Sequence, residues 1–159
     1  MKTLDELVKQ QPVFLNNWKS KIDLISDFEN INMTEFEYLA EKAPYANVQA
    51  WEEKKVRMKR AIDEWQPINI LFASYGTANY SGDAWVLFER GGELWEVSAS
   101  HCSCYGVEGQ WSPEKAVLPE LKNRLLNGKL GDDDYSDNVF KTQLASFLGI
   151  ELSLSGSEV

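Results

Sequence analysis

Cysteine and histidine are scarce in this sequence: its 159 residues include two cysteines and one histidine. The cysteines, Cys102 and Cys104, are one residue apart, so a disulfide between them cannot tie distant parts of a fold together. Proteins stabilised by several disulfides are found in oxidising compartments. Since this sequence cannot form such a set of disulfides, it favours a reducing compartment. We therefore expect a cytoplasmic protein.

Long apolar segments are absent as well. No run approaches the roughly 20 apolar residues that a membrane-spanning helix needs. The N-terminal residues also lack the apolar core of a signal peptide. We expect no membrane association.

Positive charge is in short supply. Lysine and arginine number 16 against 25 aspartate and glutamate residues, which gives a net charge of −9. Such a chain repels nucleic acid and anionic lipid, so we expect no direct binding to nucleic acid. Two interpretations of the acidity stay open. It serves solubility alone, or it meets a basic groove on a partner, as a mimic of nucleic acid would.

The residues that are present are typical of a packed globular domain. Hydrophobic residues make up 43% of the chain and six are tryptophan, and a chain of this length can bury roughly 70% of its unfolded surface. We expect one α+β domain over residues 1–159, in which a small antiparallel β-meander of three or more strands packs with N-terminal and C-terminal helices. Its expected parts are a mainly helical region 1–66, a sheet over 68–105, a helical region 112–150 and a frayed tail 153–159.

A hairpin at Gly91-Gly92 organises the predicted sheet. Two glycines readily supply the positive φ angles that a tight two-residue turn requires. The flanking residues then pair with like partners, and we expect the face that carries them to be the core, because the opposite face is more mixed. The predicted pairs are Arg90 with Glu93, Phe88 with Trp95, and Val86 with Val97.

The same register predicts where two loops meet. It places Gly82 opposite His101, so the loop 76–83 and the loop 101–109 should converge at one end of the sheet.

Helices are predicted before and after the sheet. Thr3 and Glu6 form a capping box at the start of a short helix, and apolar residues recur at helical spacing over 13–28. The other predicted helices begin at Thr34, span Tyr45–Trp65, begin at Ser112 and span Asn138–Leu148. The inward stripe predicted for the longest of them is Val48, Trp51, Lys55, Met58, Ile62 and Trp65.

One short segment concentrates the reactive side chains. His101, Cys102 and Cys104 are zinc-type ligands, and a fourth ligand could come from Asp83 or Glu108. The spacing of the cysteines is unlike that of structural zinc sites. A second interpretation is thiol catalysis by Cys102 with His101 and Asp83, although neighbours on a strand point to opposite faces. The third is structural, with both cysteines buried and His101 hydrogen-bonded to a loop carbonyl.

Aromatic and acidic side chains are candidates for a binding surface, because tyrosine and tryptophan are efficient contact residues. The aromatic residues could instead close the end of the core. The acidic loop 131–137 lacks the ligand spacing of an EF-hand, and a helix with Glu35, Glu37 and Glu41 offers a second acidic surface. The binding candidates are Tyr75, Tyr80, Asp83, Tyr105, Glu108, Trp111, Asp132, Asp133 and Asp134.

Two motifs stand out in and after the sheet: Tyr80-Ser81-Gly82-Asp83-Ala84 and Ser100-His101-Cys102-Ser103-Cys104-Tyr105-Gly106. Ser74-Tyr75-Gly76 and Glu108-Gly109-Gln110-Trp111 accompany them. This set resembles a family of small uncharacterised bacteriophage and prophage proteins, over roughly residues 50–150. The resemblance implies a mobile-element setting, in which small acidic proteins often bind and inhibit host machinery.

The function we expect is therefore binding of a host protein or protein complex in the host cytoplasm, with inhibition of a nucleic-acid-acting or defence complex. No cofactor is expected for this function. The alternative is a small enzyme or metal-dependent protein that uses His101, Cys102 and Cys104.

Overall fold

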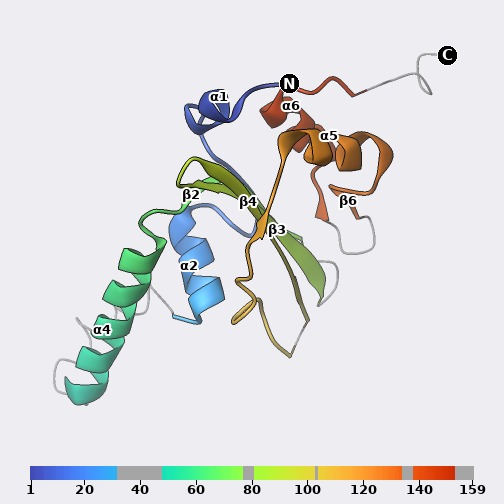
Figure 1. Ribbon diagram of the computed structural model, residues 1–159. Coiled ribbons are helices and arrows are strands. Elements are labelled where there is room, and N and C mark those ends of the chain that lie inside the picture. Colours follow the sequence, from blue (N-terminus) through green and yellow to red (C-terminus); the bar gives the residue numbers. More distant parts are fainter. Residues whose placement is uncertain (32–47, 77–80, 103, 134–137, 153–159) are drawn as a thin grey trace.

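A five-stranded sheet forms the middle of the protein (Figure 1). The computed structural model describes residues 1–31, 48–76, 81–102, 104–133 and 138–152, and of these 48–51 and 133 by their backbone alone. The strands lie side by side in chain order: β1 (Val13–Asn16), β2 (Asn69–Tyr75), β3 (Gly82–Arg90), β4 (Glu93–His101) and β5 (Glu114–Lys115). β1 runs parallel to β2, and the other neighbours are antiparallel.

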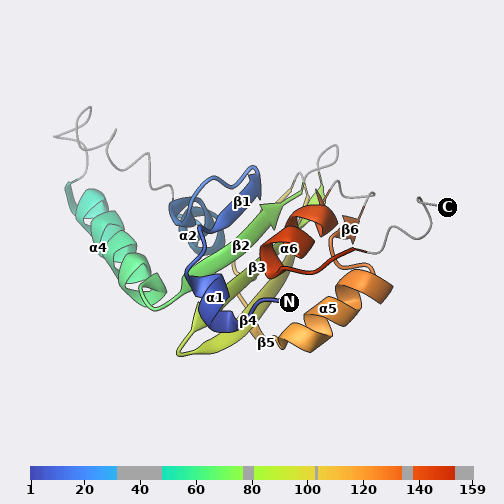
Figure 2. The ribbon, with the colours of Figure 1, turned by 90° about the horizontal axis from the view of Figure 1, so that it is seen from above.

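Helices cover both faces of this sheet (Figure 2). One face packs against α2 (Lys21–Glu29) and α4 (Val48–Trp65), and the other against α1 (Leu4–Val8), α5 (Leu118–Asn127) and α6 (Lys141–Leu148). A separate two-stranded ladder, β6 (Asp132–Asp133) with β7 (Asn138–Val139), lies between α5 and α6 in the chain. The predicted α+β class is confirmed, with one parallel strand added to the antiparallel meander.

The central hairpin has the predicted register. Gly91 and Gly92 have φ angles of 61° and 78°, in the left-handed region that a tight turn of this kind requires. Phe88 pairs with Trp95, and the ladder continues as far as His101. The local pattern of the two strands was therefore enough to predict their pairing.

Both faces of the hairpin are core, whereas the sequence predicted one. The predicted face packs against Trp18, Phe28 and Trp65. The opposite face buries Trp85 and Leu87 as well, because the C-terminal helical region covers it. That region supplies Leu121, Leu125, Phe140, Leu144, Phe147 and Leu148.

The prediction of one helix over 13–28 is wrong. Residues 13–16 form β1, which pairs in parallel with β2. This strand packs against core residues on both faces, and a short unbroken apolar run does not distinguish a strand from a helix. Asn16, with φ 64°, ends the strand. α2 then begins where the Asp23 carboxylate accepts the Ser20 backbone N–H at 3.2 Å.

The helical region predicted over 112–150 also contains strands. Ser112 does not cap a helix, because the chain adds β5 to the sheet first and α5 begins only at Leu118. The last helix begins at Lys141 and not at Asn138, which belongs to β7. In both places the backbone hydrogen bonds of a ladder replace the first turn of the predicted helix.

The stripe predicted for α4 is confirmed at Met58 and Trp65 and is wrong at Lys55 and Ile62. Met58, Ala61 and Trp65 contact the core at helical spacing, whereas Ile62 is 41% exposed and Lys55 is exposed. The helix extends beyond the sheet toward its N-terminal end (Figure 1). Its other predicted positions, Val48 and Trp51, and the helix predicted from Thr34 lie outside the described side chains.

Among the described residues, no helix combines the length and the apolar character that crossing a membrane would require.

A buried carboxylate joins the sheet to α5. Glu96 is 9% exposed; its Oε1 accepts the indole N–H of Trp85 at 3.1 Å, and its Oε2 accepts from Arg124 Nη2 at 2.5 Å. Glu120 binds the same guanidinium through Nε at 2.8 Å. The Glu96 carboxylate thus accepts hydrogen bonds from the buried indole N–H of Trp85 and from the partly buried guanidinium of Arg124.

We predict that Glu96→Ala lowers the free energy of unfolding by about 2 kcal/mol, because it leaves the Trp85 N–H unsatisfied and Arg124 without its buried partner. Glu93→Ala is the matched control. It breaks the Glu93–Lys115 ion pair, in which both side chains are about half exposed, and should cost less than about 1 kcal/mol. Urea unfolding, with the midpoint compared at constant slope, measures both. Equal losses would contradict a structural role for the Glu96 carboxylate.

Candidate functional site

The two loops that the hairpin register predicted to converge do so. Gly82 pairs with His101, and the Gly76 N–H donates to the Asp83 carbonyl at 3.0 Å. Gly82 is a glycine for a steric reason, because an added Cβ would lie 2.0 Å from the Gly76 carbonyl oxygen. The ends of β2, β3 and β4 therefore form one compact corner.

His101 is a structural part of this corner. Its Nε2 lies 2.7 Å from the Gly76 carbonyl oxygen, so Nε2 carries the proton and donates it. The ring is 7% exposed and stacks on Tyr75 at 4.2 Å between centroids, with 10° between the planes. The hydrogen bond to a loop carbonyl is the one that the structural interpretation of His101 predicted.

The two cysteines are not buried, contrary to that same interpretation. Cys104 is exposed and Cys102 is half-buried, and both thiols are free. The Cys104 backbone N–H donates to Cys102 Sγ at 3.2 Å. The Cys102 backbone N–H donates to the Tyr105 carbonyl at 3.0 Å. The backbone N–H of Cys104 is the main cause that lowers the pKa of the Cys102 thiol.

The catalytic set proposed from the sequence is not assembled. Asp83 pairs with Ser100, one position from the Gly82–His101 pair, so Asp83 projects from the face of the sheet opposite to His101. The Nε2 atom of His101 is held by Gly76. In the described part of the chain, no three His, Cys, Asp or Glu side chains come close enough together to hold a metal ion.

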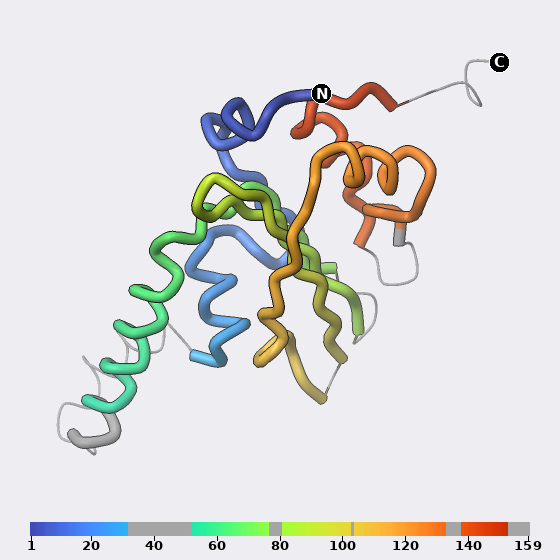
Figure 3. Tube along the Cα trace, in the orientation of Figure 1, coloured from blue at the N-terminus to red at the C-terminus, as the bar shows by residue number. Residues whose placement is uncertain are grey.

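A glutamine that sequence reasoning missed holds the loop after β4 in place. Gln110 Oε1 accepts the Ser100 N–H at 2.9 Å, and its Nε2 donates to the Ser100 carbonyl at 2.7 Å and to the Gly106 carbonyl at 3.1 Å. The side chain thus pairs with the edge of β4 as a neighbouring strand would. The Gly109 N–H donates to the Phe28 carbonyl at 3.1 Å, which fixes the loop against the end of α2 (Figure 3).

This contact between the loop and α2 encloses a pocket of about 280 Å³, which we call the acidic pocket. Among the described residues, its lining includes the carboxylates of Asp27 and Glu108 and no lysine or arginine. Sequence reasoning singled out Tyr75 and Glu108 but not Asp27, which no motif marks. The lining residues are Ser26, Asp27, Asn30, Ile31, Tyr75, Gly106, Val107 and Glu108.

Asp27 is the carboxylate of this pocket whose negative charge its surroundings disfavour. The residue is exposed overall, but one carboxylate oxygen accepts the indole N–H of buried Trp18 at 2.8 Å. Loss of solvent around the carboxylate raises its pKa, and the negative charges of Asp23 and Glu108 raise it further against the lowering effect of the Trp18 hydrogen bond. Burial likewise raises the pKa of Tyr75, with Asp27 and Glu108 adding to the effect.

The remaining binding candidates are divided between core and surface. Trp111 belongs to the core, because its ring lies 4.2 Å from that of Trp65 and 4.9 Å from that of Phe28. Tyr105 is 53% exposed, and Asp132 is exposed on β6. Outside the described residues or side chains lie Tyr80, Asp133, Asp134, Glu35, Glu37 and Glu41.

Asp83 lines a second, open cavity of about 470 Å³ on the opposite face of the sheet, together with Ser98, Lys129 and Asn138. Lys129 gives this cavity a basic residue, which the described lining of the acidic pocket does not have. The corner of the sheet thus separates two cavities of different charge.

Comparisons of the chain with protein-family models, with curated proteins and with solved structures find no match.

We predict that Gly82→Ala destabilises the protein by about 3 kcal/mol, since the new methyl group meets the Gly76 carbonyl within the ladder. Gly106→Ala is the control, because its Cβ would meet only the movable end of the Glu108 side chain, at 2.8 Å. That change should stay within about 1 kcal/mol. Denaturant unfolding measures both, and a tolerated Gly82→Ala would show that the corner is not tightly closed.

We also predict a pH-dependent stability that Asp27 causes. Because its pKa is raised from the ordinary 3.8, the folded state keeps the proton to higher pH than the unfolded chain. The resulting stabilisation is complete below the ordinary pKa and is lost as pH rises through the raised one. Asp27→Asn keeps an acceptor for Trp18 and removes the charge. As pH rises above the ordinary carboxyl pKa of 3.8, the Tm of this variant should therefore fall less, or rise more, than the Tm of the wild type. The exposed Glu151→Gln should leave the profile unchanged, and equal profiles for all three proteins would contradict the assignment.

Proposed function

We propose that this protein binds a macromolecular partner through its acidic pocket and inhibits it, the partner being a host protein or complex that acts on nucleic acid or in defence. The proposed setting is a bacteriophage or prophage protein in the cytoplasm of the host cell. A basic side chain of the partner, lysine or arginine, would enter the pocket.

The charge arrangement of the acidic pocket carries this proposal. Asp27 and Glu108 line it together, and each helps to raise the pKa of Tyr75. The carboxylate of Asp27 is held in an environment that disfavours its charge. A cation placed between the carboxylates would relieve that repulsion, so the pocket favours a positively charged group over a neutral one.

The dimensions and the donor set of the pocket suit a side chain rather than a large ligand. A volume of about 280 Å³ is slightly below the usual range of small-molecule sites, roughly 300–1,000 Å³. Carboxylate oxygens match the planar donors of a guanidinium particularly well. Proteins that handle nucleic acid offer such basic groups in the grooves where they bind phosphates.

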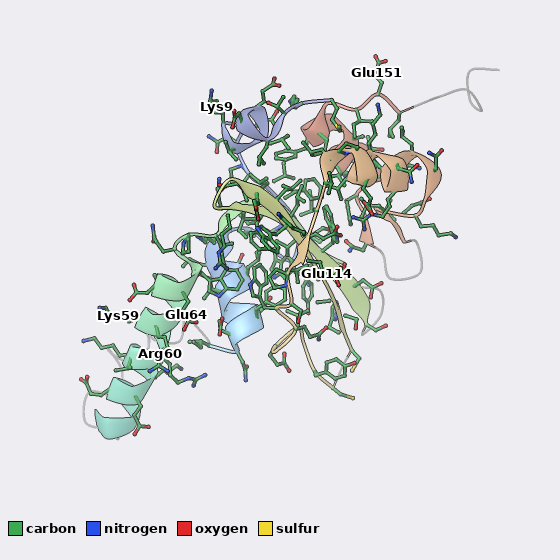
Figure 4. All side chains as sticks on the ribbon, in the orientation of Figure 1. Lys9, Lys59, Arg60, Glu64, Glu114 and Glu151 are labelled. Atoms are coloured by element: carbon green, nitrogen blue, oxygen red, sulfur yellow. The ribbon has the colours of Figure 1, made fainter. Side chains whose placement is uncertain are left out.

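The overall charge supports the same interpretation. A protein of net charge −9 attracts a basic groove over a distance of about one Debye length, ~8 Å at physiological salt. Attraction of this kind chiefly raises the association rate. The basic residues of α4, among them Lys59 and Arg60, lie on the part of the molecule that extends away from the sheet (Figure 4).

The proposal is tested with three proteins that differ by isosteric changes: the wild type, Asp27→Asn with Glu108→Gln, and Glu151→Gln as the surface control. A host lysate is passed over each immobilised protein, and partners retained by the wild type and the control but lost from the double variant are identified. We expect the association rate with such a partner to fall on the order of tenfold in the double variant. It should also fall as salt rises, while dissociation changes less.

The inhibition itself requires a separate measurement. The nucleic-acid-binding or nucleic-acid-cleaving activity of the retained partner should decrease on addition of the wild type and recover on replacement by the double variant. A partner bound equally by all three proteins, or bound without loss of its activity, would overturn the proposal.

A further inference from the structure

The turn after β4 carries two thiols, at Cys102 and Cys104. Cys102 is half-buried and Cys104 is exposed, and neither is engaged in a disulfide. The Cys104 N–H points at Cys102 Sγ at 3.2 Å, and the Cys102 N–H is held by the Tyr105 carbonyl at 3.0 Å. Hydrogen bonds to the sulfur are among the interactions that tune metal–thiolate sites.

We propose that Cys102 and Cys104 form a two-sulfur site for a soft, thiophilic metal ion, with monovalent copper as its representative ligand. Soft thiolate ligands favour Cu(I) over hard cations. On binding, each thiol gives its proton to solvent and forms one sulfur–metal bond, so the ion keeps its oxidation state and no further reactant is needed.

The surroundings distinguish this site from a zinc site. Structural zinc takes four ligands in a tetrahedron, and the described residues contain no group of three or more His, Cys, Asp or Glu side chains that could supply them. The neighbouring imidazole is engaged elsewhere, because His101 Nε2 donates to the Gly76 carbonyl and the ring stacks on Tyr75. Within the described part of the chain this leaves two sulfur ligands and no third His, Cys, Asp or Glu ligand, a number too small for structural zinc.

The two-sulfur site is independent of the proposed partner binding. None of the lining residues of the acidic pocket is a cysteine, and substitution of either thiol removes no negative charge from the pocket. A failure of one proposal thus leaves the other standing.

The test uses the full chain, reduced and kept without oxygen, with Cu(I) supplied from a coloured chelator that competes for it. We expect the wild type to remove one Cu(I) per chain, with no change of oligomeric state on metal binding by size-exclusion chromatography. Cys102→Ser and Cys104→Ser should each bind on the order of 100-fold more weakly, because the second sulfur acts at high effective concentration. Zn(II) offered in the same way should not be retained.

X-ray absorption at the copper edge supplies a second readout, and it should report sulfur neighbours without a nitrogen. The proposal is overturned if either single-cysteine variant binds as tightly as the wild type. It is equally overturned if copper is bound only between two chains, or if a nitrogen ligand shows that His101 has left Gly76. Circular dichroism of the variants checks that they are folded, which is expected since Cys104 is exposed and Cys102 half-buried.

Discussion

The close approach of Gly82 to the Gly76 carbonyl is the contact on which the candidate site depends. A methyl group at Gly82 would lie 2.0 Å from that oxygen, so only a glycine lets the start of β3 approach the end of β2 this closely. The same carbonyl accepts the proton of His101, and the imidazole ring in turn supports Tyr75. One backbone oxygen therefore fixes the imidazole that supports Tyr75, a wall of the acidic pocket, and occupies Nε2 of the histidine.

The parts of this arrangement that could be predicted from sequence are those set by local pattern. Two glycines and their flanks determine the register of β3 with β4, and the register alone carries the chain to the pairing of Gly82 with His101. The capping box of Thr3 with Glu6 is likewise local, and it is confirmed. Such features need no knowledge of what covers them.

The parts that could not be predicted depend on contacts between distant segments. The sequence of β1 predicts the start of a helix, because a short apolar run that is buried on both faces does not show the alternation typical of a strand. Only its pairing with β2 reveals that it is a strand. Asp27 carries no motif, and it becomes a site residue because the Gly109 N–H joins the loop after β4 to Phe28. Gln110 holds that loop through three hydrogen bonds that spacing does not reveal.

The environment of Asp27 also bears on the two interpretations of the acidic charge. Carboxylates that serve solubility alone are best placed in open water, where their charge does not lower the free energy of unfolding. Asp27 instead stands near two other carboxylates, Asp23 and Glu108, with solvent partly excluded, and both conditions raise its pKa. A raised carboxylate pKa means that the folded state is less stable at neutral pH than it would be without that charge. Solubility alone does not account for this loss of stability, whereas the proposed recognition of a cation would.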